Sequence, residues 1–149
     1  MLWVTKKKLR IARAATAWLI RRFIDPQAEL RFVDEGLEGR APLRVDRGVA
    51  RALRVKPDRA VARLERCDLG LVDERCADDA TLVAMGRIVH DADRGVDRPE
   101  TAEAAGLRMI TVSFPEVCDD DDEIVARSAL LYDALYHTLS KRTRAHKPG

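Results

Sequence analysis

The sequence has no long uncharged apolar run, few aromatic residues and few cysteines. Its most apolar stretch, residues 12–24, is interrupted by Arg13, Arg21 and Arg22, whereas a spanning helix needs about 20 nearly uncharged residues. At the amino terminus the cations follow the apolar residues, which reverses the order of a secretory signal peptide. We therefore expect a cytoplasmic protein without a membrane segment.

The scarcity of aromatic residues and the lack of known sequence motifs argue against several classes of binding and catalytic site. Aromatic residues make up 5% of the chain and do not alternate with the cations, so a stacking surface for nucleic acid is not indicated. The eight glycines form neither of the common phosphate-binding loop motifs. No nucleophile motif surrounds the serines, and we assign no catalytic residue. Three cysteines without CxxC spacing indicate reduced thiols.

Length and charge favour one domain with two complementary halves. The chain of 149 residues is of single-domain size. We expect residues 1–140 to form the domain and the basic residues 141–149 to be a flexible tail. Residues 1–66 hold 17 Lys and Arg against 8 Asp and Glu, while residues 67–149 hold 10 against 17. Opposite charge of this size favours packing of the halves against each other.

Hydrophobic spacing predicts an α+β fold that is mostly helical. Apolar residues recur at helical period near residues 9–24, 79–93 and 120–140, and Asp79 suits the start of the second of these helices. Pro99 fits the first turn of a further helix near residues 100–109, and Pro115 indicates a break after it. Asp25 ends the first of these helices, because the proline that follows disfavours helical dihedral angles in the residue before it. β-forming residues occupy 2–5 and 29–34. We expect these two segments to form a small β-sheet covered by about four helices.

A basic cluster lies on and just before the first helix. The candidate anion-binding residues are Lys8, Arg13, Arg21 and Arg22. A guanidinium group matches two oxygens at once, which suits an oxyanion such as chromate or sulfate. Because Arg22 follows Trp18 by four residues, it falls beside the apolar stripe. The alternative for Arg22 is an ion pair with Asp25 or Asp133.

A second cluster has the residue types of a divalent metal site. His90 and Asp93 are three residues apart, so they face the same side of a helix. Cys76 and Asp79 would add ligands from the turn before that helix. The alternative is a hydrogen bond between His90 and Asp93 near the helix end. A divalent metal ion is thus the cofactor that this cluster predicts.

Several segments resemble the ChrB C-terminal domain family of chromate resistance proteins. The resemblance begins with Trp3-Val4-Thr5 and with the run from Ala17 to Glu29, which contains Trp-Leu-Ile-Arg-Arg-Phe-Ile-Asp-Pro. Residues 88–93, 99–107 and 131–136 agree in the same order. The resemblance implies a role in bacterial chromate resistance, where ChrB proteins are chromate-responsive regulators of efflux. Longer members carry an amino-terminal part before this domain. Because the sequence begins almost directly on the Trp3 motif, we expect that part to be missing here and do not expect direct DNA binding.

These observations give one leading hypothesis and two alternatives. The leading hypothesis is a chromate-resistance accessory or sensor domain that binds an oxyanion through the basic helix. The first alternative is a metal- or thiol-dependent redox enzyme that uses Cys76, His90 and Asp93. The second is a helical interaction module that binds another copy of the chain or a regulatory partner protein.

Overall fold

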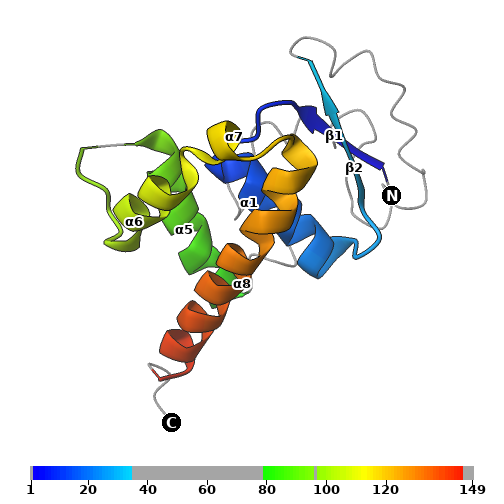
Figure 1. The fold of residues 1–149 in the computed structure, drawn as a ribbon. Coiled ribbons are helices and arrows are strands. Elements are labelled where there is room, and N and C mark those ends of the chain that lie inside the picture. The colour runs from blue at the N-terminus through cyan, green and yellow to red at the C-terminus, as the bar shows by residue number, and fades with distance from the viewer. Residues whose placement is uncertain (1, 35–78, 96, 146–149) are drawn as a thin grey trace.

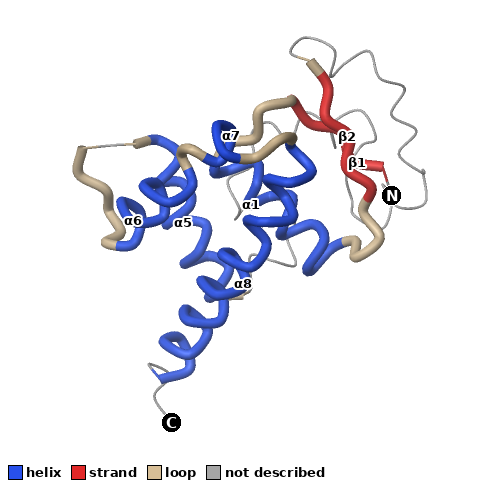
Figure 2. The backbone as a smooth tube through the Cα atoms, viewed as in Figure 1, coloured by secondary structure: helices blue, strands red, loops and turns tan. Residues whose placement is uncertain are grey.

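The computed structural model describes residues 2–34, 79–95 and 97–145, and it confirms a mostly helical α+β fold (Figures 1 and 2). Strands β1 (Leu2–Lys6) and β2 (Glu29–Val33) pair in parallel, with Trp3 opposite Leu30. Between them the chain forms helix α1 (Ile11–Leu19) and the π-helical turn η1 (Ile20–Ile24). The later helices are α5 (Ala80–Arg94), α6 (Glu103–Thr111), α7 (Phe114–Val117) and α8 (Asp121–Ala145).

The main core lies where α1, α5 and α8 pack against one another. Leu19 of α1, Met85 of α5 and Tyr132 of α8 are completely buried. Figure 1 shows the sheet on one side of these helices and α6, which packs against α5, on the other. The apolar stripe predicted for the first helix therefore points into the interior, as Ile11, Ala15 and Trp18 are all buried.

A smaller apolar cluster joins the sheet to the end of the first helical segment. Trp3 of β1 packs with Ile20 of η1 and with Ala28, which precedes β2. The Trp3 indole Nε1 donates a hydrogen bond to Asp25 Oδ2 at 3.1 Å. Asp25 has extended backbone dihedral angles and ends η1, as the sequence predicts. The same residue thus stops the helix and anchors the first strand.

The third predicted helix is shifted toward the carboxyl terminus. We expected Pro99 in its first turn and an end near residue 109, but α6 spans Glu103–Thr111. The start is later because Thr101 donates two hydrogen bonds to Asp91 Oδ2, from its backbone N–H at 2.8 Å and from its hydroxyl at 2.9 Å. Thr111 remains helical although it is β-branched, since its hydroxyl bonds the Leu107 carbonyl at 2.7 Å.

The last helix is longer than its hydrophobic pattern indicates. It continues to Ala145, so residues 141–145, which we expected to be flexible, are helical, and residues 146–149 lie outside the described ranges. Arg142 forms an ion pair with Glu103 of α6, and its hydrogen bond lowers the pKa of that carboxyl. Pro115, expected to mark a break, lies in the first turn of α7. None of the described helices has the length and apolarity to cross a membrane.

Candidate functional site

Carboxylates from two distant helices bind backbone N–H groups at the start of α1. Asp121 of α8 accepts from Lys8 N at 2.9 Å and from Leu9 N at 2.7 Å. Asp93 of α5 accepts from Ala12 N at 3.3 Å. These N–H groups lie at the positive end of the helix dipole, where negative charge is stabilising. Carboxylates of the protein itself therefore already occupy this end of the basic helix.

The side chain of Arg13 is hydrogen-bonded to the backbone, whereas the side chain of Lys8 is exposed to solvent. The Arg13 guanidinium donates to the carbonyls of Lys6 and Lys8 at 3.4 and 3.1 Å, so it braces the loop between β1 and α1. Lys8 adopts a left-handed backbone conformation with φ of 60°, which is uncommon outside glycine. Its ammonium group is exposed and has no bonded partner among the described residues.

A pocket of about 580 Å³ borders this loop, but its charges are mixed. Lys7, Lys8 and Arg31 line it together with the four aspartates 119–122. Carboxylates so close together disfavour a dianion in the same pocket. The Cys118 thiol also lines it, and burial together with nearby Glu123 raises the pKa of that thiol. A protonated thiol is a poor nucleophile.

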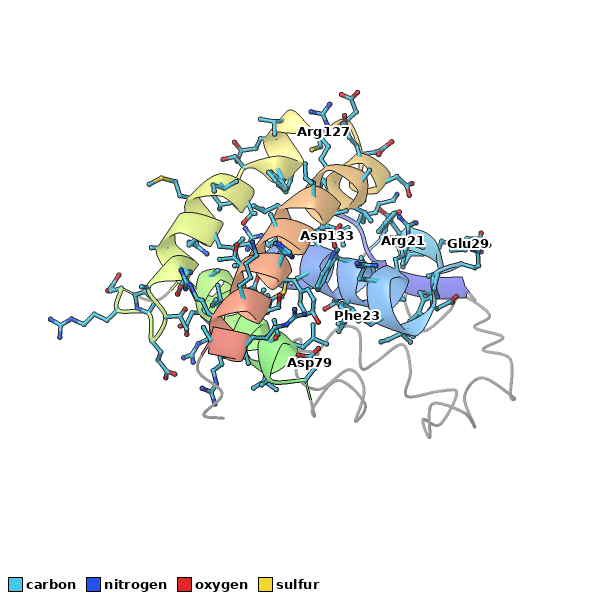
Figure 3. All side chains as sticks on the ribbon, turned by 90° about the horizontal axis from the view of Figure 1, so that it is seen from below. Arg21, Phe23, Glu29, Asp79, Arg127 and Asp133 are labelled. Carbon is cyan, nitrogen blue, oxygen red and sulfur yellow. The ribbon has the colours of Figure 1, made fainter. Side chains whose placement is uncertain are left out.

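Arg21 and Arg22 lie at the other end of the first helical segment, in η1. Both side chains are exposed. Arg22 Nε lies 3.5 Å from Asp133 Oδ1, and the guanidinium carbon lies 5.9 Å from the centre of the Phe23 ring. The predicted alternative for Arg22, an ion pair with Asp133, is thus confirmed. Arg21 bonds no described residue; in the view of Figure 3 it lies between Asp133 and Glu29.

The predicted anion-binding residues therefore form two pairs instead of one cluster. Eight residues separate Arg13 from Arg21, which corresponds to a rise of about 12 Å along a helix. The Arg13 guanidinium is bonded to loop carbonyls at the start of α1, so it is not placed to share a small oxyanion with Arg21. Arg13 and Lys8 meet at the start of α1, where the guanidinium donates to the Lys8 carbonyl, whereas Arg21 and Arg22 are adjacent residues of η1.

Asp133 also connects η1 to an aromatic cluster, consisting of Trp18, Phe23, Tyr132 and Tyr136. The Trp18 indole donates to Asp133 Oδ1 at 3.0 Å. The Tyr132 hydroxyl donates to the Ile11 carbonyl at 3.0 Å, and burial raises the pKa of Tyr132, so the phenol stays neutral and able to donate. Sequence spacing did not reveal this cluster, because it joins side chains that are more than a hundred residues apart.

The predicted metal ligands are distributed over both ends of α5. Asp79 caps the start of this helix, accepting from Thr81 N and Leu82 N at 2.8 and 3.2 Å, and also from the Tyr136 hydroxyl at 3.0 Å. His90 follows eleven residues later, a rise of about 16 Å. Cys76 lies outside the described residues. Within the described ranges no three His, Cys, Asp or Glu side chains are arranged to hold a metal ion.

Comparison with known proteins assigns nearly the whole chain to one family. The family model described as "ChrB, C-terminal domain" matches residues 3–139. The chain is similar to Protein ChrB of Cupriavidus metallidurans, with 32% identity over 146 residues, which is 95% of this chain and 42% of that protein. The chain thus spans less than half the length of this relative, and no solved structure matches it. Because the family model covers nearly the whole chain, the protein belongs to the ChrB C-terminal domain family.

Proposed function

We propose that this chain is a chromate-resistance accessory or sensor domain that binds a tetrahedral oxyanion at Arg21 and Arg22. Membership of the ChrB C-terminal domain family supports the role in chromate resistance. One structural observation supports the position of the site. Arg21 is exposed and bonds none of the described residues, and it adjoins Arg22, whose terminal nitrogens bond none of them either.

The chemistry of the pair suits a dianion. Each guanidinium group presents paired N–H donors that match two oxygens of the anion. The pair formed by Arg22 and Asp133 uses only Nε, and Asp133 is also held by Trp18, so Arg22 is positioned without losing its terminal donors. The wider turn of a π-helix commonly marks a functional position. The proposal places the oxyanion at the outer surface of η1.

Chromate is expected to raise the melting temperature of the wild-type protein, because a ligand that binds only the native state stabilises it. The double variant Arg21→Ala, Arg22→Ala is expected to lose this rise completely. Thermal unfolding with and without millimolar chromate measures it. Arg21→Lys with Arg22→Lys keeps the charge but loses the paired donors, so a reduced rise is expected.

Arg87→Ala is the matched control for this experiment. Arg87 is an exposed arginine of α5 with no bonded partner in the described part of the chain, and its removal is expected to leave the chromate-dependent rise unchanged. Sulfate, a dianion of the same shape, tests selectivity. An equal rise with sulfate would identify a general oxyanion site, and the absence of any rise in the wild-type protein would contradict the proposal.

A further inference from the structure

A second pocket, of about 420 Å³, lies between the carboxyl-terminal end of α5 and helix α6. Ala105 and Met109 of α6 line it together with Val112, the residue that directly follows this helix, at spacings of four and three. Pro99 forms part of its wall from the preceding loop. The side chains of Met109 and Val112 are 81% and 45% exposed, although apolar surface of this kind is usually buried. The pocket therefore presents an apolar wall to solvent.

A single guanidinium group is fixed within this pocket. Arg108 Nη1 donates to the carbonyl of Ala92 at 2.9 Å and lies 3.5 Å from the carbonyl of Asp93. These carbonyls belong to the last turns of α5, where a cation is favoured by the helix dipole. The guanidinium also packs over Gly95, whose φ is +60° and where a Cβ atom would lie 2.6 Å from Arg108 Cζ. The left-handed backbone conformation favours glycine here, and any larger residue would also push the Arg108 guanidinium out of this position.

The opposite edge of the Arg108 guanidinium forms no hydrogen bond with the part of the chain that the structure describes. Its contacts with described residues use Nη1, so Nε and Nη2 bond none of them. These two nitrogens form the side-on edge of arginine, which matches the two oxygens of a carboxylate. Two acidic residues also line the pocket. Asp91 is turned toward Thr101, to which it is bonded twice, and Asp97 is exposed.

We propose that this pocket binds an organic monocarboxylate with an apolar body. The carboxylate would pair side-on with Nε and Nη2 of Arg108, and the apolar body would pack against Met109 and Val112. Pockets for small ligands commonly combine apolar walls with one charged group that fixes orientation. An inorganic oxyanion would satisfy Arg108 but leave the apolar wall in water. This site is separate from Arg21 and Arg22, so either proposal can fail alone.

A chain-length series of carboxylates tests the chemical class. Calorimetric titration of the full chain with butanoate, hexanoate and octanoate is expected to show affinity rising roughly three- to fourfold per methylene that enters the pocket. The sulfate comparison uses the Arg21→Ala, Arg22→Ala variant, which lacks the other proposed anion site, and there sulfate is expected to bind at least tenfold more weakly than octanoate. Equal binding of sulfate and octanoate, or no binding of octanoate at millimolar concentration, would overturn the proposal.

Variants locate the binding at Arg108 and at the apolar wall. Arg108→Lys keeps the charge but removes the side-on edge, so octanoate affinity is expected to fall at least tenfold. Met109→Ala is expected to weaken octanoate several-fold, while Ile110→Ala is expected to change nothing. Ile110 is also exposed on α6, at 57%, and does not line the pocket. Because both residues are exposed, both variants should fold, and equal affinities in the two would overturn the proposed location.

Asp97→Asn tests the charge balance of the pocket. Removing this like charge is expected to tighten octanoate binding about two- to threefold at low salt, with a smaller gain at high salt because exposed charges are screened. Weaker binding in this variant would show that the ligand is not held as an anion and would overturn the proposal.

Discussion

Trp18→Ala is expected to lower the free energy of unfolding by about 3 to 5 kcal/mol, the usual cost of truncating a large buried aromatic side chain. Trp18 is only 3% exposed and has ring centroids 5.5 to 6.0 Å from those of Phe23, Tyr132 and Tyr136. The substitution leaves a cavity between α1 and α8 and removes the hydrogen bond to Asp133. Urea unfolding followed by far-ultraviolet circular dichroism measures the loss.

Trp18→Phe separates packing from hydrogen bonding. The phenyl ring retains most of the apolar contact but cannot donate to Asp133. Because Asp133 is exposed and can bond water instead, this variant is expected to recover more than half of the stability lost in the alanine variant. A Trp18→Ala protein within about 1 kcal/mol of the wild type would show that the aromatic cluster does not stabilise the contact between the two helices.

Asp121→Ala is expected to cost about 2 to 3 kcal/mol, since hydrogen bonds to a charged group each contribute about 1.5 to 3 kcal/mol and this carboxylate is partly exposed. The side chain accepts from Lys8 N and Leu9 N. Without it, the left-handed conformation of Lys8 loses the contact that holds it. Chemical unfolding gives the total loss, and amide hydrogen exchange of Lys8 and Leu9 reports on the junction itself.

Asp122→Ala is the matched control for Asp121. Both residues lie in the first turn of α8 and interact with its dipole, but Asp122 is exposed and bonds no described residue. We expect this control to change stability by less than about 0.5 kcal/mol. Equal losses in the two variants would indicate a general charge effect in place of the specific contact with the start of α1.

The sequence predicted those elements whose signals are local. The spacing of Ile11, Ala15 and Trp18 marked the buried stripe of α1, and Asp25 before proline marked the end of the helical segment. Asp79 marked the start of α5, where its side chain accepts two backbone N–H groups. The π-helical form of η1 escaped prediction because apolar spacing does not distinguish it from an α-helix over five residues.

Long-range contacts account for most of what the sequence did not predict. Four consecutive aspartates look alike in the sequence, yet only Asp121 reaches across 113 positions to Lys8. Arg108 carries no motif, and its pocket depends on Gly95 and on the exit from α5. The basic residues were recognised as a group, but helix length alone separates Arg13 from Arg21. Pattern reasoning thus identified the cations without indicating which could act together.

The attachment of the start of α1 to α5 and α8 has a consequence for how the chain folds. Contacts such as Leu9 with Asp121 and Ile11 with Tyr132 join residues more than 110 positions apart. Loops of that length must close before these bonds can form, and high contact order of this kind slows folding. A fragment ending before α5 would keep Arg13 but lack Asp93, Asp121 and Tyr132, which bind the junction between the first strand and its helix from α5 and α8. The first and last segments therefore acquire their native form only together.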